Sequence, residues 1–93
     1  MRLILYGKPG CHLCEGLEEK LQQIRGDLNF DLELRDINSR DDWFDAYQYE
    51  VPVLCKESAG KEEQLPRPSP RASVAQVQLM LQKYLANNPE SAQ

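Results

Sequence analysis

Hydrophobic and polar positions follow two different periods along the first half of the chain. Leu3 to Tyr6 is a continuous apolar run of residues that favour β-structure, which predicts a central strand covered on both faces. The run is broken by Gly7-Lys8-Pro9-Gly10, in which three of four residues favour a turn. We therefore expect a buried strand followed directly by a turn.

The next segment carries apolar residues at helical spacing. A helix is expected to begin at Cys11 or His12 and to stop at Gly26. Gly16 lies inside this helix and costs about 1 kcal/mol relative to alanine. We therefore expect close packing against Gly16. One apolar stripe runs along the helix: Cys14, Leu17, Leu21 and Ile24.

Apolar and charged residues alternate from Phe30 to Arg35, which is typical of a strand with one face in water. The alternating charges favour a place at the sheet edge, where they discourage pairing with another chain. Ser39 followed by Asp42 resembles a capping box and predicts a short helix from Arg40 to Tyr47. Its aromatic residues are expected to pack inward: Trp43, Phe44 and Tyr47.

Two further strands are predicted in the second half of the chain. The third covers Val53 to Cys55 and is opened by Pro52, at a position where strands tolerate proline. The polar stretch from Lys56 to Gln64 suits a hairpin turn into a fourth strand near Glu63 to Leu65. A free cysteine in an apolar run is commonly buried, so Cys55 is expected in the core.

A last helix follows a proline-rich segment that cannot be regular structure. It begins either near Ser69, with Pro70 at its first position, or near Ser73, with Gln76 completing a capping box. Asn87-Asn88-Pro89 ends it, and residues 86–93 are expected to form a frayed tail. Its core-facing stripe comprises Val74, Val77, Leu81, Tyr84 and Leu85.

The element order βαβαββα predicts an α/β fold with a four-stranded mixed sheet and helices on both faces. The first strand, helix and second strand imply a parallel pair joined by a right-handed crossover. A chain of 93 residues has room for one core, so we expect a single domain over residues 1–93.

Composition and charge exclude several classes of function. The net charge of −4 argues against nucleic acid as a partner, because phosphate binding requires clustered Lys and Arg. No apolar run is long enough to cross a membrane, and no secretory leader is visible. Three cysteines do not form the even, dense framework of a secreted disulfide scaffold. A cytoplasmic protein with a reactive C-x-x-C is expected.

Cys11 and Cys14 stand at the start of the first predicted helix, where a C-x-x-C indicates redox chemistry. Unpaired N–H groups and the helix dipole favour a thiolate at Cys11, and the thiolate is the reactive form. Cys14 is one helical turn away and can close a disulfide onto Cys11. The alternatives are an inactive remnant and a zinc site, for which the chain offers only Cys11, Cys14, Cys55 and His12.

The segment K-P-G-C-H-L-C from Lys8 to Cys14, the Val51-Pro52 pair and the terminal helix resemble glutaredoxins and the wider thioredoxin fold. The resemblance runs from Arg2 to about Leu85. It implies a thioredoxin-like, glutaredoxin-type thiol-disulfide oxidoreductase with roles in electron transport and cell redox homeostasis. It also implies that Cys11 attacks a substrate disulfide and that Cys14 resolves the mixed disulfide.

The resemblance assigns further roles near the cysteines. Lys8 matches the lysine that glutaredoxins use against a glutathione carboxylate; the alternative is a solvated turn lysine. His12 and Leu13 occupy the two positions that tune the redox potential, and a charged His12 would stabilise the thiolate. C-H-L-C departs from the C-P-Y-C common in glutaredoxins, which leaves the potential and the preferred substrate open.

Pro52 resembles the cis-proline that faces the active site in this fold, the alternative being an ordinary trans proline. A cis bond would expose the Val51 N–H and C=O to an extended substrate, like an added strand. Glu50 replaces the usual threonine. The Gly-Gly and Asp that hold glutathione in glutaredoxins are missing from residues 65–70. Arg67 or Arg71 either faces an anionic group instead or is solvated.

The expected partners are a disulfide-containing protein or a glutathione mixed disulfide, with a reductase or glutathione as electron donor. Glutathione is a candidate reductant or co-substrate, and no bound cofactor or metal, no nucleic acid and no membrane is expected. A second hypothesis is a non-catalytic binding or adaptor module that uses the Val51-Pro52 edge. A third is an iron–sulfur carrier bridged by Cys11 from two chains with glutathione. Cys14 argues against it, because the family members that carry clusters generally have C-G-F-S.

Overall fold

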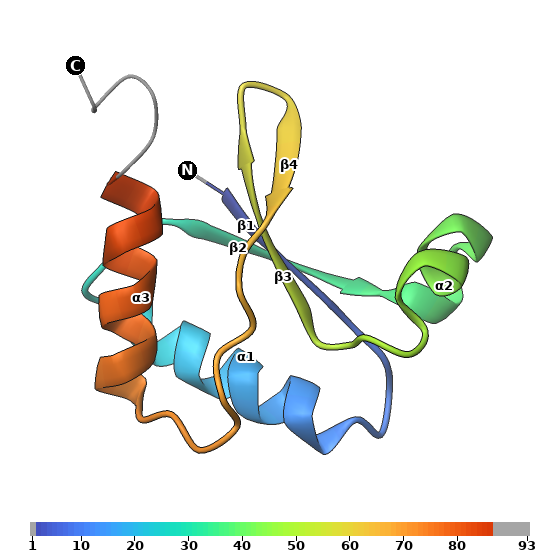
Figure 1. The fold of residues 1–93 in the computed structure, drawn as a ribbon, viewed down its shortest axis with the longest axis horizontal. Helices are drawn as coiled ribbons and strands as arrows, with labels where there is room; N and C mark the ends of the chain where they lie inside the picture. The colour runs from blue at the N-terminus through green and yellow to red at the C-terminus, as the bar shows by residue number, and fades with distance from the viewer. Residues whose placement is uncertain (1, 87–93) are drawn as a thin grey trace.

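The strands β1 (Arg2–Gly7), β2 (Asp31–Asp36), β3 (Val53–Ser58) and β4 (Lys61–Gln64) form one mixed sheet in the computed structural model, which describes residues 2–86 (Figure 1). Their order across the sheet is β2-β1-β3-β4. β1 pairs with β2 in parallel and with β3 in antiparallel orientation, and β4 pairs with β3 in antiparallel orientation. The predicted parallel pair and the edge position of the charged strand are confirmed.

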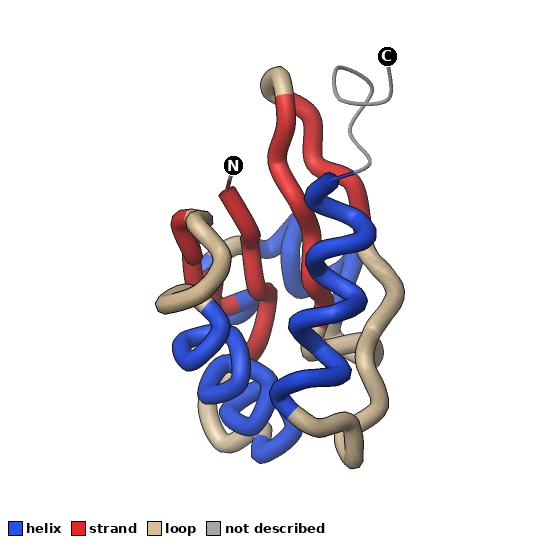
Figure 2. Tube along the Cα trace, turned by 90° about the vertical axis from the view of Figure 1, so that its left-hand side faces the viewer, coloured by secondary structure: helices blue, strands red, loops and turns tan. Residues whose placement is uncertain are grey.

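Helices cover both faces of the sheet. α1 (His12–Ile24) and α3 (Val74–Ala86) pack on one face, where the buried side chains of β1 meet Leu17, Leu21 and Leu81. The short helices η1 (Ile37–Ser39) and α2 (Asp41–Tyr47) follow β2 and pack against the other face. Figures 1 and 2 show the segment between β4 and α3 descending beside α3 before the chain turns back into the helix. The predicted α/β fold is therefore confirmed.

The helical stripes predicted from spacing lie in the core. All four residues of the α1 stripe are buried, and the stripe of α3 packs in the same cluster. The Ser73 alternative for the start of α3 is confirmed, because the Gln76 N–H donates to Ser73 Oγ at 3.1 Å and the Ser73 N–H donates to Gln76 Oε1 at 2.8 Å.

The β3–β4 hairpin is tighter than the sequence predicts. Ala59 and Gly60 have φ angles of 54° and 78°, as in a two-residue turn whose twist suits the flanking strands. β3 therefore continues past Cys55 to Ser58, and β4 begins at Lys61 rather than at Glu63.

The predicted capping box at Ser39 and Asp42 is wrong. The N-cap of α2 is Arg40, without a side-chain cap. Ser39 Oγ donates to the Asp36 carbonyl at 2.6 Å, which belongs to the preceding η1 turn. Asp42 instead forms an ion pair with Arg40 at 2.9 Å. The competing local turn explains the error, because a Ser side chain bonds whichever backbone group lies nearest.

Two packing predictions are also wrong. Phe44 does not pack inward but is 40% exposed, because α2 has two turns and only Trp43 and Tyr47 face the core cluster. Gly16 is not closely packed: a Cβ placed there would meet no atom within 4 Å. The sequence predicts a frayed tail over residues 86–93. Ala86 belongs to α3 instead, and residues 87–93 lie outside the described residues.

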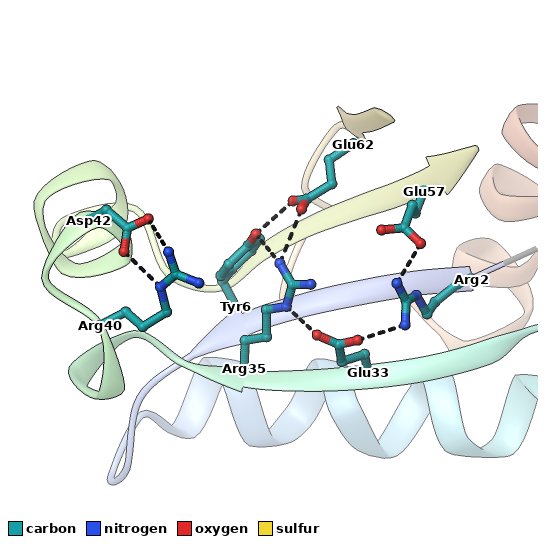
Figure 3. Close-up of polar contacts among 8 residues, drawn as sticks. All are labelled: Arg2, Tyr6, Glu33, Arg35, Arg40, Asp42, Glu57 and Glu62. Carbon is teal, nitrogen blue, oxygen red and sulfur yellow. Dashed lines mark hydrogen bonds and ion pairs between the residues drawn. The ribbon is translucent and has the colours of Figure 1, made fainter. Parts of the chain in front are cut away.

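Charged side chains cross the sheet on the α2 side (Figure 3). Tyr6 donates to Glu62 at 2.6 Å and accepts from Arg35 at 2.7 Å, which joins β1, β2 and β4. Arg35 also pairs with Glu33, which in turn meets Arg2 at 2.9 Å. This network places charge over strands that α2 is too short to cover. Among the described helices, none is long and apolar enough to cross a membrane.

Candidate functional site

Cys11 is the N-cap residue of α1. Its backbone is extended, with φ −86° and ψ 104°, and its Sγ accepts a hydrogen bond from the Cys14 N–H at 3.2 Å. The preceding turn closes through the Cys11 N–H and the Lys8 carbonyl at 3.3 Å, and Gly10 adopts the φ of +80° that this turn requires. A sulfur therefore occupies the N-cap position that Ser or Asp commonly fills, where an orphan helix N–H points at it.

Cys11 and Cys14 form a disulfide, with their Cα atoms 5.3 Å apart. Cys11 is half-buried, whereas Cys14 is 7% exposed. The two sulfurs are thus within mutual reach, as their spacing predicts. The difference in burial leaves Cys11 the more accessible of the two cysteines to an incoming reactant.

The two residues between the cysteines project outward. The His12 side chain is 95% exposed, and its Nδ1 lies 3.2 Å from Glu15 Oε1. Leu13 is 51% exposed. His12 therefore faces the Glu15 carboxylate and solvent. Leu13 offers an apolar surface next to the cysteines.

The Val51–Pro52 peptide bond is cis, as the resemblance implies. The prediction for the Val51 backbone needs a correction, because the Val51 N–H already donates to the Tyr47 carbonyl at 3.2 Å. The last turn after α2 takes up this donor, so of the two Val51 backbone groups only the carbonyl is left for an extended substrate. Pro52 itself borders a cavity together with His12 and Leu13.

That cavity is a groove of about 160 Å³ between α1 and the segment that leads from β4 to α3. Arg67 anchors one wall, because its Nη1 donates to the Glu50 carbonyl at 3.2 Å, next to the cis bond. Lys20 anchors the same wall from α1, because its Nζ donates to the Pro70 carbonyl at 3.1 Å. The lining residues are His12, Leu13, Gly16, Leu17, Lys20, Pro52, Arg67, Pro68, Ser69 and Pro70.

Lys8 lies on a different side of the cysteine pair. It is exposed and borders a second cavity, of about 340 Å³, which Gly7 and Cys14 also line. The structure therefore brings His12, Leu13 and Pro52 together around one groove and places Lys8 outside it.

Cys55 is a core residue, as predicted. It is 2% exposed and packs with Ile4 and Tyr6 on the α2 side of the sheet. Burial, reinforced by the Glu62 carboxylate, raises the pKa of the Cys55 thiol to about 11. Because α1 lies on the opposite face, Cys55 does not join Cys11 and Cys14 in the zinc set that the sequence offered. Within residues 2–86, no three His, Cys, Asp or Glu side chains gather as metal ligands.

The sequence did not place Gly16 and Lys20 of α1 in a groove, and it left Arg67 either facing an anionic group or solvated. One signal for the groove wall was present in the sequence. Pro66, Pro68 and Pro70 alternate with polar residues, which favours an extended segment that cannot pair with the sheet. Where that wall would lie relative to α1 depends on the tertiary fold.

Comparisons with known proteins agree with this architecture. A family model described as "Glutaredoxin-like domain (DUF836)" matches residues 2–82. Thioredoxin 1 from the thermophilic eubacterium Thermosipho africanus TCF52B superposes with a TM-score of 0.65 at 20% identity, over 91% of this chain and 94% of that chain. The structural genomics target protein XcR50 from X. campestris superposes with a TM-score of 0.60 at 27% identity, over 87% of this chain and 96% of that chain. A designed protein superposes with a TM-score of 0.66 at 18% identity, over 94% of this chain and 78% of that chain. No curated protein matches the sequence.

Proposed function

The chain belongs to the glutaredoxin-like domain family, and from that premise we propose that it is a glutaredoxin-type thiol-disulfide oxidoreductase. The thioredoxin-like fold and the paired Cys11 and Cys14 support redox function in general. The observation that carries the specific proposal is the place of Cys11 Sγ, which accepts the Cys14 N–H at 3.2 Å on the first turn of α1.

The first step is attack by the Cys11 thiolate on one sulfur of a substrate disulfide. The Cys11–substrate bond forms as the substrate S–S bond breaks, and the displaced sulfur leaves as a thiolate. Two features of α1 stabilise the attacking thiolate before the reaction. One is the hydrogen bond from the Cys14 N–H to Cys11 Sγ, and the other is the positive end of the helix dipole.

The second step is attack by Cys14 on Cys11 Sγ within the mixed disulfide. It forms the Cys11–Cys14 disulfide and releases the second substrate sulfur as a thiolate, so the substrate gains two electrons and the protein loses two. The Cα separation of 5.3 Å lies within the range that a disulfide requires. A dithiol reductase or two molecules of glutathione then return two electrons to the pair.

The experiment follows reduction of 2-hydroxyethyl disulfide, with glutathione and its reductase in one arm and thioredoxin reductase in the other. Cys11→Ser should abolish turnover in both arms. Cys14→Ser should retain only the reactions that glutathione completes, and it should accumulate a Cys11 mixed disulfide visible by intact mass. Turnover that survives Cys11→Ser would refute the proposal.

The second hypothesis, a non-catalytic adaptor that presents the Val51-Pro52 edge, finds less support. The Val51 N–H is occupied by Tyr47, so a partner strand would gain one backbone hydrogen bond there instead of two. The same assay separates the hypotheses, because an adaptor gives no turnover with either electron donor.

A further inference from the structure

The groove beside the cysteine pair has the character of a side-chain pocket. Its apolar lining comes from Leu13, Leu17, Pro52 and the prolines of the opposite wall. Its volume of about 160 Å³ is comparable to the roughly 150 Å³ of an apolar cavity that accepts benzene. One aromatic or large aliphatic side chain therefore fits, at a place where His12 and Leu13 set it beside the disulfide.

Gly16 keeps this pocket open. A glycine inside a helix costs about 1 kcal/mol relative to alanine, and at Gly16 no neighbouring atom demands it, since a Cβ would meet nothing within 4 Å. The residue instead lines the groove, so any side chain at this position would extend into the space. The helix therefore contains a destabilising glycine at the position that borders the empty pocket, and close packing does not explain it.

The charge around the pocket has one sign. Lys20 and Arg67 line it, and no Asp or Glu does. Each cation donates to a neutral backbone carbonyl, Pro70 for Lys20 and Glu50 for Arg67, and in the described part of the chain neither forms an ion pair with a carboxylate. In a chain with net charge −4, two cations without carboxylate partners beside one apolar groove favour an acidic ligand.

The groove does not end at Pro52. Pro52 and Arg67 also border a second hollow, of about 250 Å³, whose lining includes the exposed Tyr49 and one acidic residue, Glu50. The carboxylate of the ligand is therefore assigned to the first groove, where no Asp or Glu lies. Cavities on both sides of the same two residues suit a ligand that extends across Pro52, which a polypeptide does.

We propose, on the premise of the function proposed above, that this groove selects polypeptide disulfides in which a large apolar side chain and a carboxylate flank the reactive cysteine. The apolar side chain enters the pocket that Gly16 leaves open. The carboxylate meets Arg67 and Lys20 at the rim. Gly16 and Arg67 are therefore specificity-determining residues of this site.

The test uses the reduced full-length protein and four disulfide-linked peptides that differ only beside the cysteine. One neighbour is phenylalanine or alanine, and the other is glutamate or glutamine. Wild-type kcat/KM should favour phenylalanine by about tenfold, the effect of burying part of an aromatic ring. It should favour glutamate by about two- to fivefold at low salt, and less as salt is added.

Variants assign each preference to its residue. Gly16→Leu, which suits a helix, should bring the phenylalanine-to-alanine ratio close to one by filling the pocket. Arg67→Gln should weaken the glutamate preference, and the remainder should be due to Lys20. Arg71→Gln, on the same segment but outside the groove, is the matched control and should keep both ratios. Equal rates for the four peptides, or an unchanged phenylalanine ratio in Gly16→Leu, would overturn the proposal.

A second readout separates this proposal from the proposed function. The same peptides with serine in place of cysteine cannot react, and their binding is followed by NMR titration of the protein amides. Phenylalanine-dependent binding without turnover of any disulfide would contradict the oxidoreductase and leave the groove assignment standing. Turnover without any peptide preference would contradict the groove assignment and leave the oxidoreductase standing.

Discussion

Gly7, the last residue of β1, lies directly against the side chain of Cys14. A Cβ added at Gly7 would lie 3.2 Å from Cys14 Cβ and 3.3 Å from its Sγ, closer than side chains normally approach. The strand-to-helix turn thus brings the backbone of β1 against Cys14, and a side chain at Gly7 would displace this cysteine or the strand end by a few tenths of an ångström.

Gly7→Ala should therefore lower the free energy of unfolding by about 1 kcal/mol, because either the strand end or Cys14 must shift. Gly16→Ala is the matched control: its methyl group would meet no atom within 4 Å, and it should raise the same quantity by up to about 1 kcal/mol. Urea unfolding of the oxidised proteins measures both. Stabilisation by Gly7→Ala would contradict the close contact.

Glu62 should make stability depend on pH. Its hydrogen bond from Tyr6 and its ion pair with Arg35 at 3.1 Å hold the pKa of the Glu62 carboxyl below its ordinary value. Because the pKa is lower in the folded chain, the stabilisation is present above the ordinary glutamate value of about 4.3 and is lost as pH falls through the folded-state pKa.

Glu62→Gln should accordingly lower the free energy of unfolding by about 0.5–1 kcal/mol at pH 7, and by less at pH 3. Urea unfolding at several pH values checks this, with Glu19→Gln on the exposed surface of α1 as control. An equal loss for Glu62→Gln at both pH values would show that the carboxylate charge has no part in the effect.

Lys56 ties β3 to the end of α3. Its side chain is 6% exposed, its Nζ donates to the Tyr84 carbonyl at 3.0 Å, and the same Nζ lies 3.6 Å from Glu63 Oε1. Lys56→Met keeps the length of the side chain but removes both contacts, so it should lower the free energy of unfolding by about 1–2 kcal/mol. Lys61→Met, on the exposed β4, should change it by less than about 0.5 kcal/mol.

Cys55 should take no part in the redox chemistry. It is 2% exposed, and burial raises the pKa of its thiol to about 11. In the reduced protein at pH 7, iodoacetamide should therefore label Cys11 quickly and Cys55 only after unfolding, as peptide mass mapping would reveal. Cys55→Ala should leave disulfide reduction unchanged. Labelling of Cys55 in the folded protein would show that the core opens at β3.

Short-range patterns predicted most of the fold. The apolar run of β1, the stripe of α1 and the alternation of β2 each reflect the period of a single element, so the sequence alone contains them. The proximity of Cys11 and Cys14 is predictable for the same reason, since they are three positions apart at a helix start.

The errors at Phe44 and Gly16 depend on contacts between distant segments, whereas the capping-box and hairpin errors come from local turns at Ser39 and at Ala59-Gly60. Phe44 was expected to be buried because it is aromatic, but the short α2 turns it to solvent. Gly16 was expected to be crowded, but the wall that faces it, around Arg67 and Pro68, leaves a groove instead of filling it. The link from Tyr6 to Arg35 and Glu62 joins three strands, so no local pattern announces it.

In the reduced protein α1 should hold the Cys11 sulfur as a thiolate, and the alkylation rate of Cys11 as a function of pH reports this ionisation. The measurement uses Cys14→Ser/Cys55→Ala, so that Cys11 is the single thiol of the chain. The midpoint of this pH profile should lie clearly below the value of about 8.5 for a free cysteine. A midpoint at or above that value would contradict it.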